Sequence, residues 1–291
     1  MSPVILAYIL MGLAILCASL FGVMIRLASD AGGDLHTILM FRNLFGLVAV
    51  LLFFVGKRRE KIVTNNLIHH IGRSVIATTA IGLYIYTIAH LPLANAATLQ
   101  FAMPLFLPLV SYYFFREIPK PISYSMLVLA LMGALLIADP SSQEFVPIVT
   151  LAGVFGAFLT AVVTNYGKKI LLVDNIWTLI FWFSLIPTIL TFPWYVYEGI
   201  GIPIKEVAVY SSIAGVLANM HQFLSLSAYK YLNSTSLGAM TYLTVPMVLF
   251  FGWFFFSELP SMAAIIGIGI ILSANALNFI YQNKAKAFKH E

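Results

Sequence analysis

Apolar runs as long as a membrane-crossing helix follow one another along almost the whole chain. Such a helix needs roughly 20 consecutive, mostly apolar residues to cross the hydrocarbon core of a bilayer. Of the 291 residues, 61% are hydrophobic and 9% are charged, whereas a soluble protein has roughly 25% charged residues. These values exclude an ordinary soluble domain and predict an all-α integral membrane protein.

Charged residues, prolines, glycines and asparagines divide the chain into ten such runs with short connections. The longest polar connection, 56–70, is too short to form a soluble domain between two spans. The predicted spans are 4–27, 36–55, 71–91, 95–115, 122–138, 147–167, 175–196, 208–230, 236–256 and 262–282.

Lysines and arginines are distributed unevenly over these connections. With a cytoplasmic N-terminus, thirteen of them, Arg73 included, lie on the cytoplasmic side, and Lys205 alone lies on the other. Arg26 and Arg42 fall within or at the ends of spans and are not counted. Because short cytoplasmic loops are enriched in Lys and Arg, both termini are predicted to be cytoplasmic, with the protein in the bacterial cytoplasmic (inner) membrane. The same distribution explains the net charge of +5 without a nucleic-acid partner.

A short motif occurs twice, at a spacing close to half the chain. Phe-Phe-Arg-Glu-Ile-Pro ends at Pro119, and Phe-Phe-Ser-Glu-Leu-Pro ends 141 residues later at Pro260. The two halves, 1–140 and 141–291, have five predicted spans each, an odd number, so they must insert in opposite orientations. The predicted fold is therefore ten transmembrane helices in two inverted five-helix repeats. Many secondary transporters have inverted repeats and bind their substrate near the midplane.

The P…E-x-P ends of the fourth and ninth spans, the five-plus-five arrangement and Arg42 inside the second span resemble the drug/metabolite transporter superfamily, specifically its ten-span EamA-like family. The resemblance covers essentially the whole chain. It implies a basket in which the third, fourth, eighth and ninth helices, with parts of the first and sixth, enclose a central cavity. Export is the commoner role in the family, and its solutes are too varied for membership to select one.

Two prolines within the fourth and ninth spans are predicted to kink their helices. A proline frees the carbonyl four residues before it, which is that of Gln100 for Pro104 and that of Tyr242 for Pro246. Such a carbonyl, beside a polar side chain, could bind an ammonium or a hydroxyl group. The alternative is that each proline only bends its helix to fit its neighbours.

Polar side chains inside an apolar span are functional candidates, because their burial is costly unless they are paired or face water. His221, Gln222 and Ser225 share one face of the eighth span, and Tyr84 lies well inside the third. His221 is the one mid-span group expected to titrate near neutral pH, and the alternative is a hydrogen-bonded structural histidine. The predicted substrate-binding residues are Tyr84, Gln100, His221, Gln222, Ser225 and Tyr242.

Three charged residues are predicted to be structural. Arg42 lies near the outer side of the second span, where Asp34 or Asp30 could pair with it. Glu117 and Glu258 stand just before a proline at the start of the next helix, where a carboxylate complements the positive helix end.

Motifs for enzymatic chemistry are missing from the sequence. It contains no glycine-rich phosphate loop, no HExxH and no GxSxG, so neither a cofactor nor a metal site is predicted. A secondary transporter working by alternating access, monomeric or homodimeric in the lipid bilayer, is the favoured function. An integral-membrane enzyme acting on a lipid or prenyl substrate, or a structural subunit, is the alternative.

The expected solute is an amino acid, an amine or a related zwitterionic or cationic metabolite, with export favoured over uptake. This expectation rests on the cavity candidates being neutral or aromatic, with no Lys or Arg expected at midplane to hold an anionic phosphate. Proton coupling through His221 and facilitated exchange both remain open.

Overall fold

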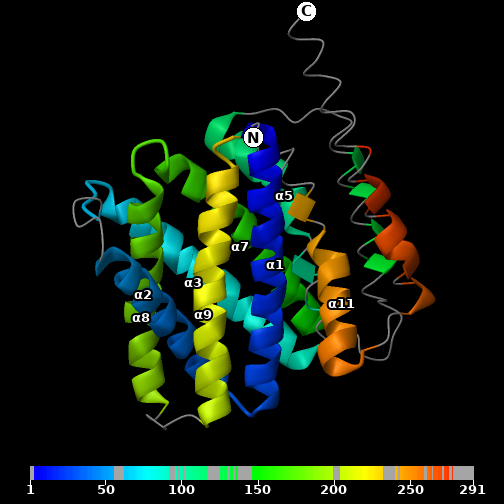
Figure 1. Ribbon diagram of the computed structural model, residues 1–291, viewed down its shortest axis with the longest axis horizontal. Coiled ribbons are helices and arrows are strands. Elements are labelled where there is room, and N and C mark those ends of the chain that lie inside the picture. The colour runs from blue at the N-terminus through cyan, green and yellow to red at the C-terminus, as the bar shows by residue number, and fades with distance from the viewer. Residues whose placement is uncertain are drawn as a thin grey trace, which may run out of the picture.

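The computed structural model is all-helical in the part of the chain that it describes (Figure 1). The described residues are 3–55, 62–91, 96, 99–100, 102–116, 146–198, 204–231, 240–241 and 243–258, with parts of 125–136 and 261–277. The helices are α1 (Pro3–Asp30), α2 (Leu35–Val55), α3 (Leu67–His90), α5 (Met103–Phe115), α7 (Pro147–Ile170), α8 (Ile176–Tyr197), α9 (Lys205–Ala228) and α11 (Thr244–Phe256).

Six predicted spans match helices closely, and five of these are long and apolar enough to cross a membrane: α1, α2, α3, α7 and α8. The sixth, α9, is equally long but carries more polar residues. The predicted spans 122–138 and 262–282 are described only in parts. The chain is thus an all-α protein with membrane-type helices.

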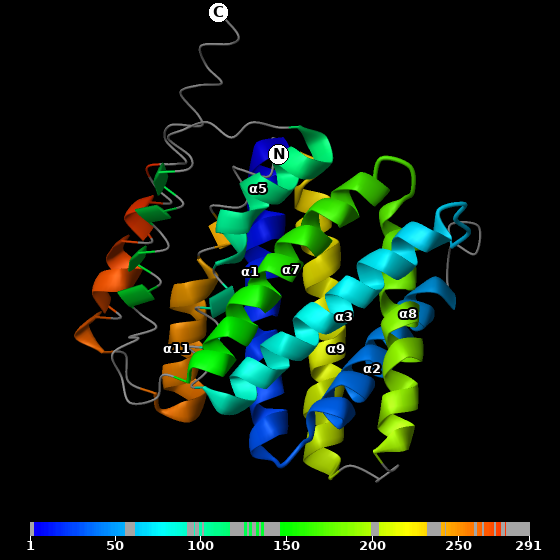
Figure 2. The same cartoon turned by 180° about the vertical axis from the view of Figure 1, so that it is seen from behind.

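The helices pack in pairs that relate the two halves of the chain. Equivalent helices begin about 141 residues apart, as Met103 of α5 and Thr244 of α11 do. The contact of α1 with α9 corresponds to that of α7 with α3, and the contact of α1 with α11 corresponds to that of α7 with α5. Likewise α2 packs on α9 as α8 packs on α3, and α2 packs on α8 in the middle. Figure 2, the view from behind, shows α3 crossing in front of α9, next to α7.

The first helices of the two halves run in opposite directions. The start of α1 packs against the end of α9, where Ala7 and Met11 meet Ala228. The end of α7 lies at the same end of the bundle, because the Lys168 ammonium sits 4.3 Å from the ring centre of Tyr229. The start of α1 therefore meets the end of α7, as an inverted repeat requires.

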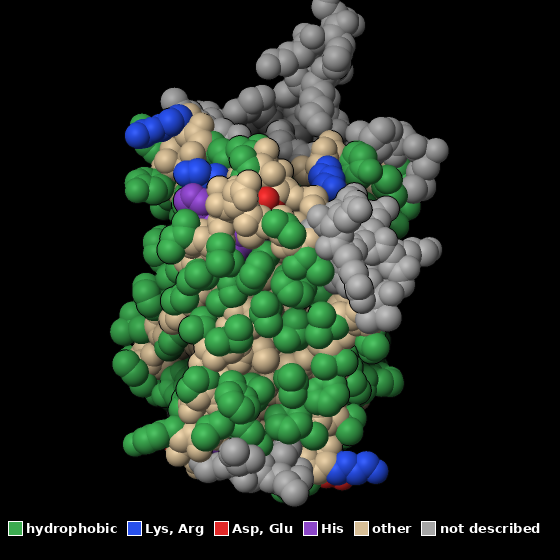
Figure 3. All heavy atoms as spheres, turned by 90° about the vertical axis from the view of Figure 1, so that its left-hand side faces the viewer, with side chains coloured by type: hydrophobic (Ala, Val, Ile, Leu, Met, Phe, Trp, Pro, Cys, Tyr) green, Lys and Arg blue, Asp and Glu red, His purple; other side chains and the backbone are tan. Residues whose placement is uncertain are grey.

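We name the two ends of the bundle by residues that lie there. The Lys205 end holds the connection between α1 and α2, since Gly33 packs on Val207 near the start of α9. The Asp174 end holds the connection between α7 and α8. On the face shown in Figure 3, a broad hydrophobic band separates basic side chains at the two ends. Side chains such as Ile148 and Ile189 are exposed, as expected of a lipid-facing surface.

The fourth and ninth predicted spans each have a break in their helical hydrogen bonding just before the proline. At the breaks Ala102 N–H donates to Leu99 O and Leu243 N–H donates to Met240 O, three residues back instead of four. Ala102 and Leu243 keep right-handed helical dihedrals, and α5 and α11 begin directly afterwards, with Pro104 and Pro246 in their first turns. A proline has no N–H to donate to the carbonyl four residues back, so each break lies where the prolines are predicted to bend the span. We call α5 and α11, which follow the breaks, half-helices.

The repeated motif ends both half-helices in the same way. Arg116 after α5 and Ser257 after α11 have φ of 57° and 55°. They are the non-glycine residues with positive φ in the described part of the chain. A left-handed residue commonly ends a helix. The sequence repeat is thus also a repeat of backbone conformation.

Candidate functional site: a cavity with two buried arginines

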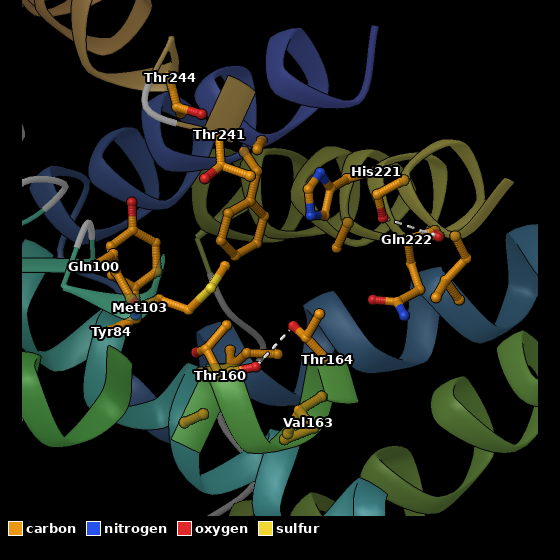
Figure 4. Close-up of a pocket in the computed structure, with 18 of the residues that line it drawn as sticks. Tyr84, Gln100, Met103, Thr160, Val163, Thr164, His221, Gln222, Thr241 and Thr244 are labelled. Carbon is orange, nitrogen blue, oxygen red and sulfur yellow. Dashed lines mark hydrogen bonds between the residues drawn. The ribbon is translucent and has the colours of Figure 1, made fainter. Parts of the chain in front are cut away.

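A cavity of about 250 Å³ lies inside the bundle (Figure 4). Residues of all eight helices named above line it. The helices that the family resemblance assigns to the cavity are among them, and α2 and α8 add Arg42 and Phe183. The lining is mostly apolar with few polar groups, which is typical of small-molecule sites. Its volume lies just below the roughly 300–1,000 Å³ of drug-sized pockets.

Five of the six predicted substrate-binding residues line this cavity: Tyr84, Gln100, His221, Gln222 and Ser225. The sixth, Tyr242, lies outside the described residues. Figure 4 shows labelled side chains of α3, α5, α7 and α9 converging on the cavity from different sides. Polar residues from three separate predicted spans thus meet at one site.

His221 both lines the cavity and binds a neighbouring helix. Its Nδ1 lies 3.0 Å from the carbonyl oxygen of Ala14 in α1. A carbonyl oxygen only accepts hydrogen bonds, so Nδ1 carries the proton, and Nε2 of the neutral ring is an acceptor. His221 is therefore tied to α1 through one nitrogen and leaves the other for a solute.

The other polar residues of α9 divide between the cavity and the helix packing. Ser225 donates to the carbonyl oxygen of Gln222 at 3.3 Å, within its own helix. Asn219 instead joins helices, because its Nδ2 donates to Gly46 O of α2 at 2.8 Å and its Oδ1 accepts from Ser184 of α8 at 3.2 Å. The side-chain amide of Gln222 is therefore the main polar group that α9 offers to a solute besides His221.

The interrupted spans turn the starts of their half-helices toward the cavity. Gln100 and Met103 line it at the start of α5, and Thr241 and Thr244 line it at the start of α11. The residues before these helices, Ala102 and Leu243, make no side-chain cap hydrogen bond.

Two threonines of α7 were not predicted from the sequence. Thr160 and Thr164 line the cavity, and each donates at 2.8 Å to the carbonyl four residues earlier, Gly156 O and Thr160 O. Their four-residue spacing is the sequence signal that could have found them, because it places both on one helix face.

Arg42 is buried without an acidic partner, which corrects the predicted pairing with Asp34 or Asp30. Asp30 is paired with Arg26 instead, at 2.9 Å. The Arg42 side chain donates to Asn43 Oδ1 and lies over the Phe21 ring, 5.5 Å from its centre. Its exposed fraction is 6%, and its Nε has no partner among the described residues. Arg42 lines the cavity, which a purely structural role does not require.

Arg73 also lines the cavity, although the sequence placed it in a cytoplasmic connection. Helix α3 begins at Leu67, four residues before the predicted span, so Arg73 lies inside the helix with an exposed fraction of 2%. Its Nε donates to Val163 O at 3.2 Å, and its guanidinium lies 4.5 Å from the centre of the Phe183 ring. Its Nη2 has no partner in the described part of the chain. The cavity therefore contains arginine, contrary to the expectation from sequence.

Asp174, an acidic residue at the end of the bundle where α3 begins, is hydrogen-bonded to residues other than Arg73. Asp174 Oδ2 accepts hydrogen bonds from His70 Nε2 at 2.9 Å and from Thr64 Oγ1 at 2.7 Å. His70 is buried and Asp174 nearly so. This pair ties the start of α3 to the connection between α7 and α8, and it fixes the Asp174 end of the bundle.

Of the two glutamates in the repeated motif, Glu258 is not among the residues that line the cavity, and Glu117 is outside the described residues. Glu258 follows the left-handed Ser257, and its Oε2 lies 3.0 Å from the place that a Cβ on Gly252 would occupy. Its carboxylate therefore folds back on the last turn of α11.

Several curated relatives are named as bacterial transporters. The chain is 26% identical to the "Pseudopaline exporter CntI" of Pseudomonas aeruginosa, over 89% of this chain and 92% of the relative. It is 22% identical to the "S-adenosylmethionine uptake transporter" of Rickettsia felis, over 89% and 88%. It is 23% identical to the "Riboflavin transporter" of Rhizobium johnstonii, over 75% and 71%. The chain is a transporter of small metabolites and not an enzyme, so the lipid or prenyl enzyme is set aside.

A structural comparison shows the fold, and a family model shows the family. One solved crystal structure superposes with a TM-score of 0.71 at 19% identity, covering 94% of this chain and 97% of the other, which shows the shared fold. The model of the EamA-like transporter family matches the chain twice, over residues 5–138 and 147–280. The chain therefore belongs to the EamA-like transporter family.

Proposed function

We propose that the protein is a secondary transporter that carries a small organic metabolite across the bacterial cytoplasmic membrane by alternating access, in the direction of export and with both termini cytoplasmic. The observation that carries this proposal is the cavity in the middle of the bundle, lined by helices of both halves. A site between two repeats becomes accessible from either side when one repeat rocks against the other.

The contacts at the Lys205 end support an arrangement that is closed on that side. Arg26 Nη1 donates to Ile88 O at 3.0 Å and to Leu91 O at 2.9 Å, which joins α1 to the end of α3. Phe21 and Tyr84 stack at 6.2 Å between these bonds and the cavity. The largest hydrophobic cluster, which includes Ile38 and Val207, fills the same end. In alternating access these contacts would separate as the contacts at the Asp174 end close.

The test is solute movement by the purified full-length protein in proteoliposomes, with a panel of radiolabelled metabolites. Ala218→Trp places an indole in the cavity that Ala218 lines and should abolish uptake and counterflow. Val216→Trp on the same helix is the matched control, because Val216 is 38% exposed on the outer surface, and it should retain transport. Equal activity of both variants would show that the cavity is not the path.

Direction is tested separately in everted membrane vesicles and intact cells. Export predicts accumulation of solute inside everted vesicles, whose interior corresponds to the outside of the cell. Accumulation in intact cells that overproduce the protein, without accumulation in everted vesicles, would establish uptake instead.

A further inference from the structure

We propose that the transported solute is an organic dianion whose two oxyanion groups, carboxylate or phosphate, are bound by Arg42 and Arg73. This inference rests on the proposed transport function and names the substrate class of its cavity. Both guanidinium groups line the same cavity and are more than nine-tenths buried. Each has a buried nitrogen without a partner in the described part of the chain, Nε of Arg42 and Nη2 of Arg73.

The charge balance of the cavity points to a dianion. Among the residues that the structure describes, its lining contains no aspartate or glutamate. In the whole sequence, no acidic residue lies centrally in a predicted span. A buried charge is costly unless a counter-charge accompanies it. Two arginines without acidic partners therefore need two negative charges, which a dianionic solute brings.

The two arginines lie at different positions along the cavity, which indicates that each binds its own oxyanion group. Arg42 lies at the deep end of the cavity, over the Phe21 ring that stacks on Tyr84. Arg73 is seven residues into α3 from the Asp174 end. The cavity continues on that side to Tyr229, which ends α9. An elongated solute with an anionic group at each end matches this placement.

The remaining contacts favour an anion as well. Lys168 lies over the Tyr229 ring at 4.3 Å, so a third cation stands beside the lining at the Asp174 end. Gln222 and His221 supply neutral hydrogen bonds to the middle of the solute.

Gly167 makes room for Arg73 on α7. A Cβ at position 167 would lie 3.0 Å from Nε and 3.3 Å from Nη2 of Arg73. Gly167 is therefore a positioning residue for Arg73. Gly167→Ala should shift the guanidinium without changing the charge of the cavity.

The experiment measures binding by calorimetry and transport by counterflow with the full-length protein. The probes are succinate, its neutral diamide succinamide, the monoanion butyrate, the diamine putrescine and glycerol 3-phosphate. Succinate should bind, and butyrate, succinamide and putrescine should bind about tenfold or more weakly, since a charged hydrogen bond is lost with each missing anion. Glycerol 3-phosphate, whose charge is on a single phosphate group, should also bind more weakly than succinate, because it leaves one arginine without an anion.

Variants test the two arginines. Arg42→Gln and Arg73→Gln should each weaken dianion binding about ten- to hundredfold, and Gly167→Ala should weaken it less. Lys205→Gln, which removes an exposed cation at the start of α9 outside the cavity, should leave it unchanged. Without solute, both glutamine variants should unfold at or above the wild-type temperature, because they remove an uncompensated buried charge. A clear fall in that temperature would mark the arginines as structural and overturn the proposal.

The outcomes separate this inference from the proposed function. Transport of putrescine or succinamide, unaffected by Arg42→Gln and Arg73→Gln, would overturn the dianion and leave the transporter in place. Dianion binding that depends on both arginines, without transport of any probe, would support the site and contradict the transport function. Butyrate binding as tightly as succinate would overturn the assignment of two anionic groups.

Discussion

Single residues show where sequence reasoning succeeded and where it failed. Tyr84, Gln100 and His221 were predicted as cavity residues because polar side chains in apolar spans need a reason to be there, and they line the cavity. Arg73 was missed because it is the third residue of the predicted span 71–91 and was counted with the cytoplasmic connection before it. The helix starts earlier, at Leu67, and the guanidinium is enclosed by Phe183 and the α7 backbone, which only the tertiary structure reveals.

His221 is predicted to bind solute and to hold α1 against α9. His221→Gln keeps an N–H donor for the Ala14 carbonyl and should retain folding and transport. His221→Ala removes the bond and should cost about 1–3 kcal/mol of unfolding free energy, besides raising the apparent substrate constant. Denaturant unfolding in detergent and counterflow in proteoliposomes measure the two effects. Counterflow that survives His221→Gln, with loss of transport driven by a pH gradient, would instead make His221 a proton carrier.

At the scale of elements, the spans and the places of their breaks are predictable, and the angle at each break is not. Hydropathy located α1, α2 and α8 to within a few residues at each end. A proline in an apolar run predicts a break in the helical hydrogen bonds, and the breaks at Ala102 and Leu243 lie just before Pro104 and Pro246. The angle at each break depends on the neighbouring helices on which the half-helices pack, which the sequence does not show.

The crossing of α2 and α9 should be intolerant of any side chain at Gly215. A Cβ there would lie 2.1 Å from the backbone oxygen of Arg42 and 2.8 Å from the amide nitrogen of Gly46. Backbone atoms cannot swing aside, so Gly215→Ala must separate the helices, at a cost of about 1–3 kcal/mol or more. It should also shift Arg42 and weaken transport.

The matched control for this crossing is Gly12→Ala in α1, where nothing lies within 4 Å of the new Cβ. That variant should be neutral or stabilising by up to about 1 kcal/mol, because alanine favours a helix over glycine. Thermal unfolding in detergent compares the two. Equal melting temperatures for Gly215→Ala and Gly12→Ala would contradict the close helix crossing.

The junction after α11 is predicted to depend on Glu258 for stability more than for binding. Its carboxylate lies against Gly252 beside the left-handed Ser257, away from the cavity lining. Glu258→Gln should lower the melting temperature while the substrate constant changes little. Glu198→Gln is the control, since Glu198 lies at the exposed end of α8 and its oxygen accepts from Trp194. Normal folding of Glu258→Gln with abolished binding would place Glu258 in the transport mechanism.

For the whole molecule, the sequence duplication has a counterpart in the helix packing. The pairs α1–α9 and α7–α3 are equivalent in the two halves, and α1 and α7 run in opposite directions. The inverted repeat was predicted from the motif that recurs 141 residues later and from the odd number of spans in each half. The solute class was not predictable in the same way, because it depends on which side chains of eight helices meet in one cavity.

The orientation of the whole molecule in the membrane gives the last prediction. With Arg73 moved into the cavity, the count of basic residues on the predicted cytoplasmic side falls from thirteen to twelve, still against Lys205 alone. The Lys205 end should therefore face the periplasm. In a Cys17→Ser background, which removes the single cysteine, Lys205→Cys should react with an impermeant maleimide in whole cells. Asn65→Cys, exposed at the Asp174 end, should react only after the membrane is permeabilised. Labelling of Asn65→Cys in intact cells with protection of Lys205→Cys would reverse the orientation, and with it the side from which a solute first meets Arg73.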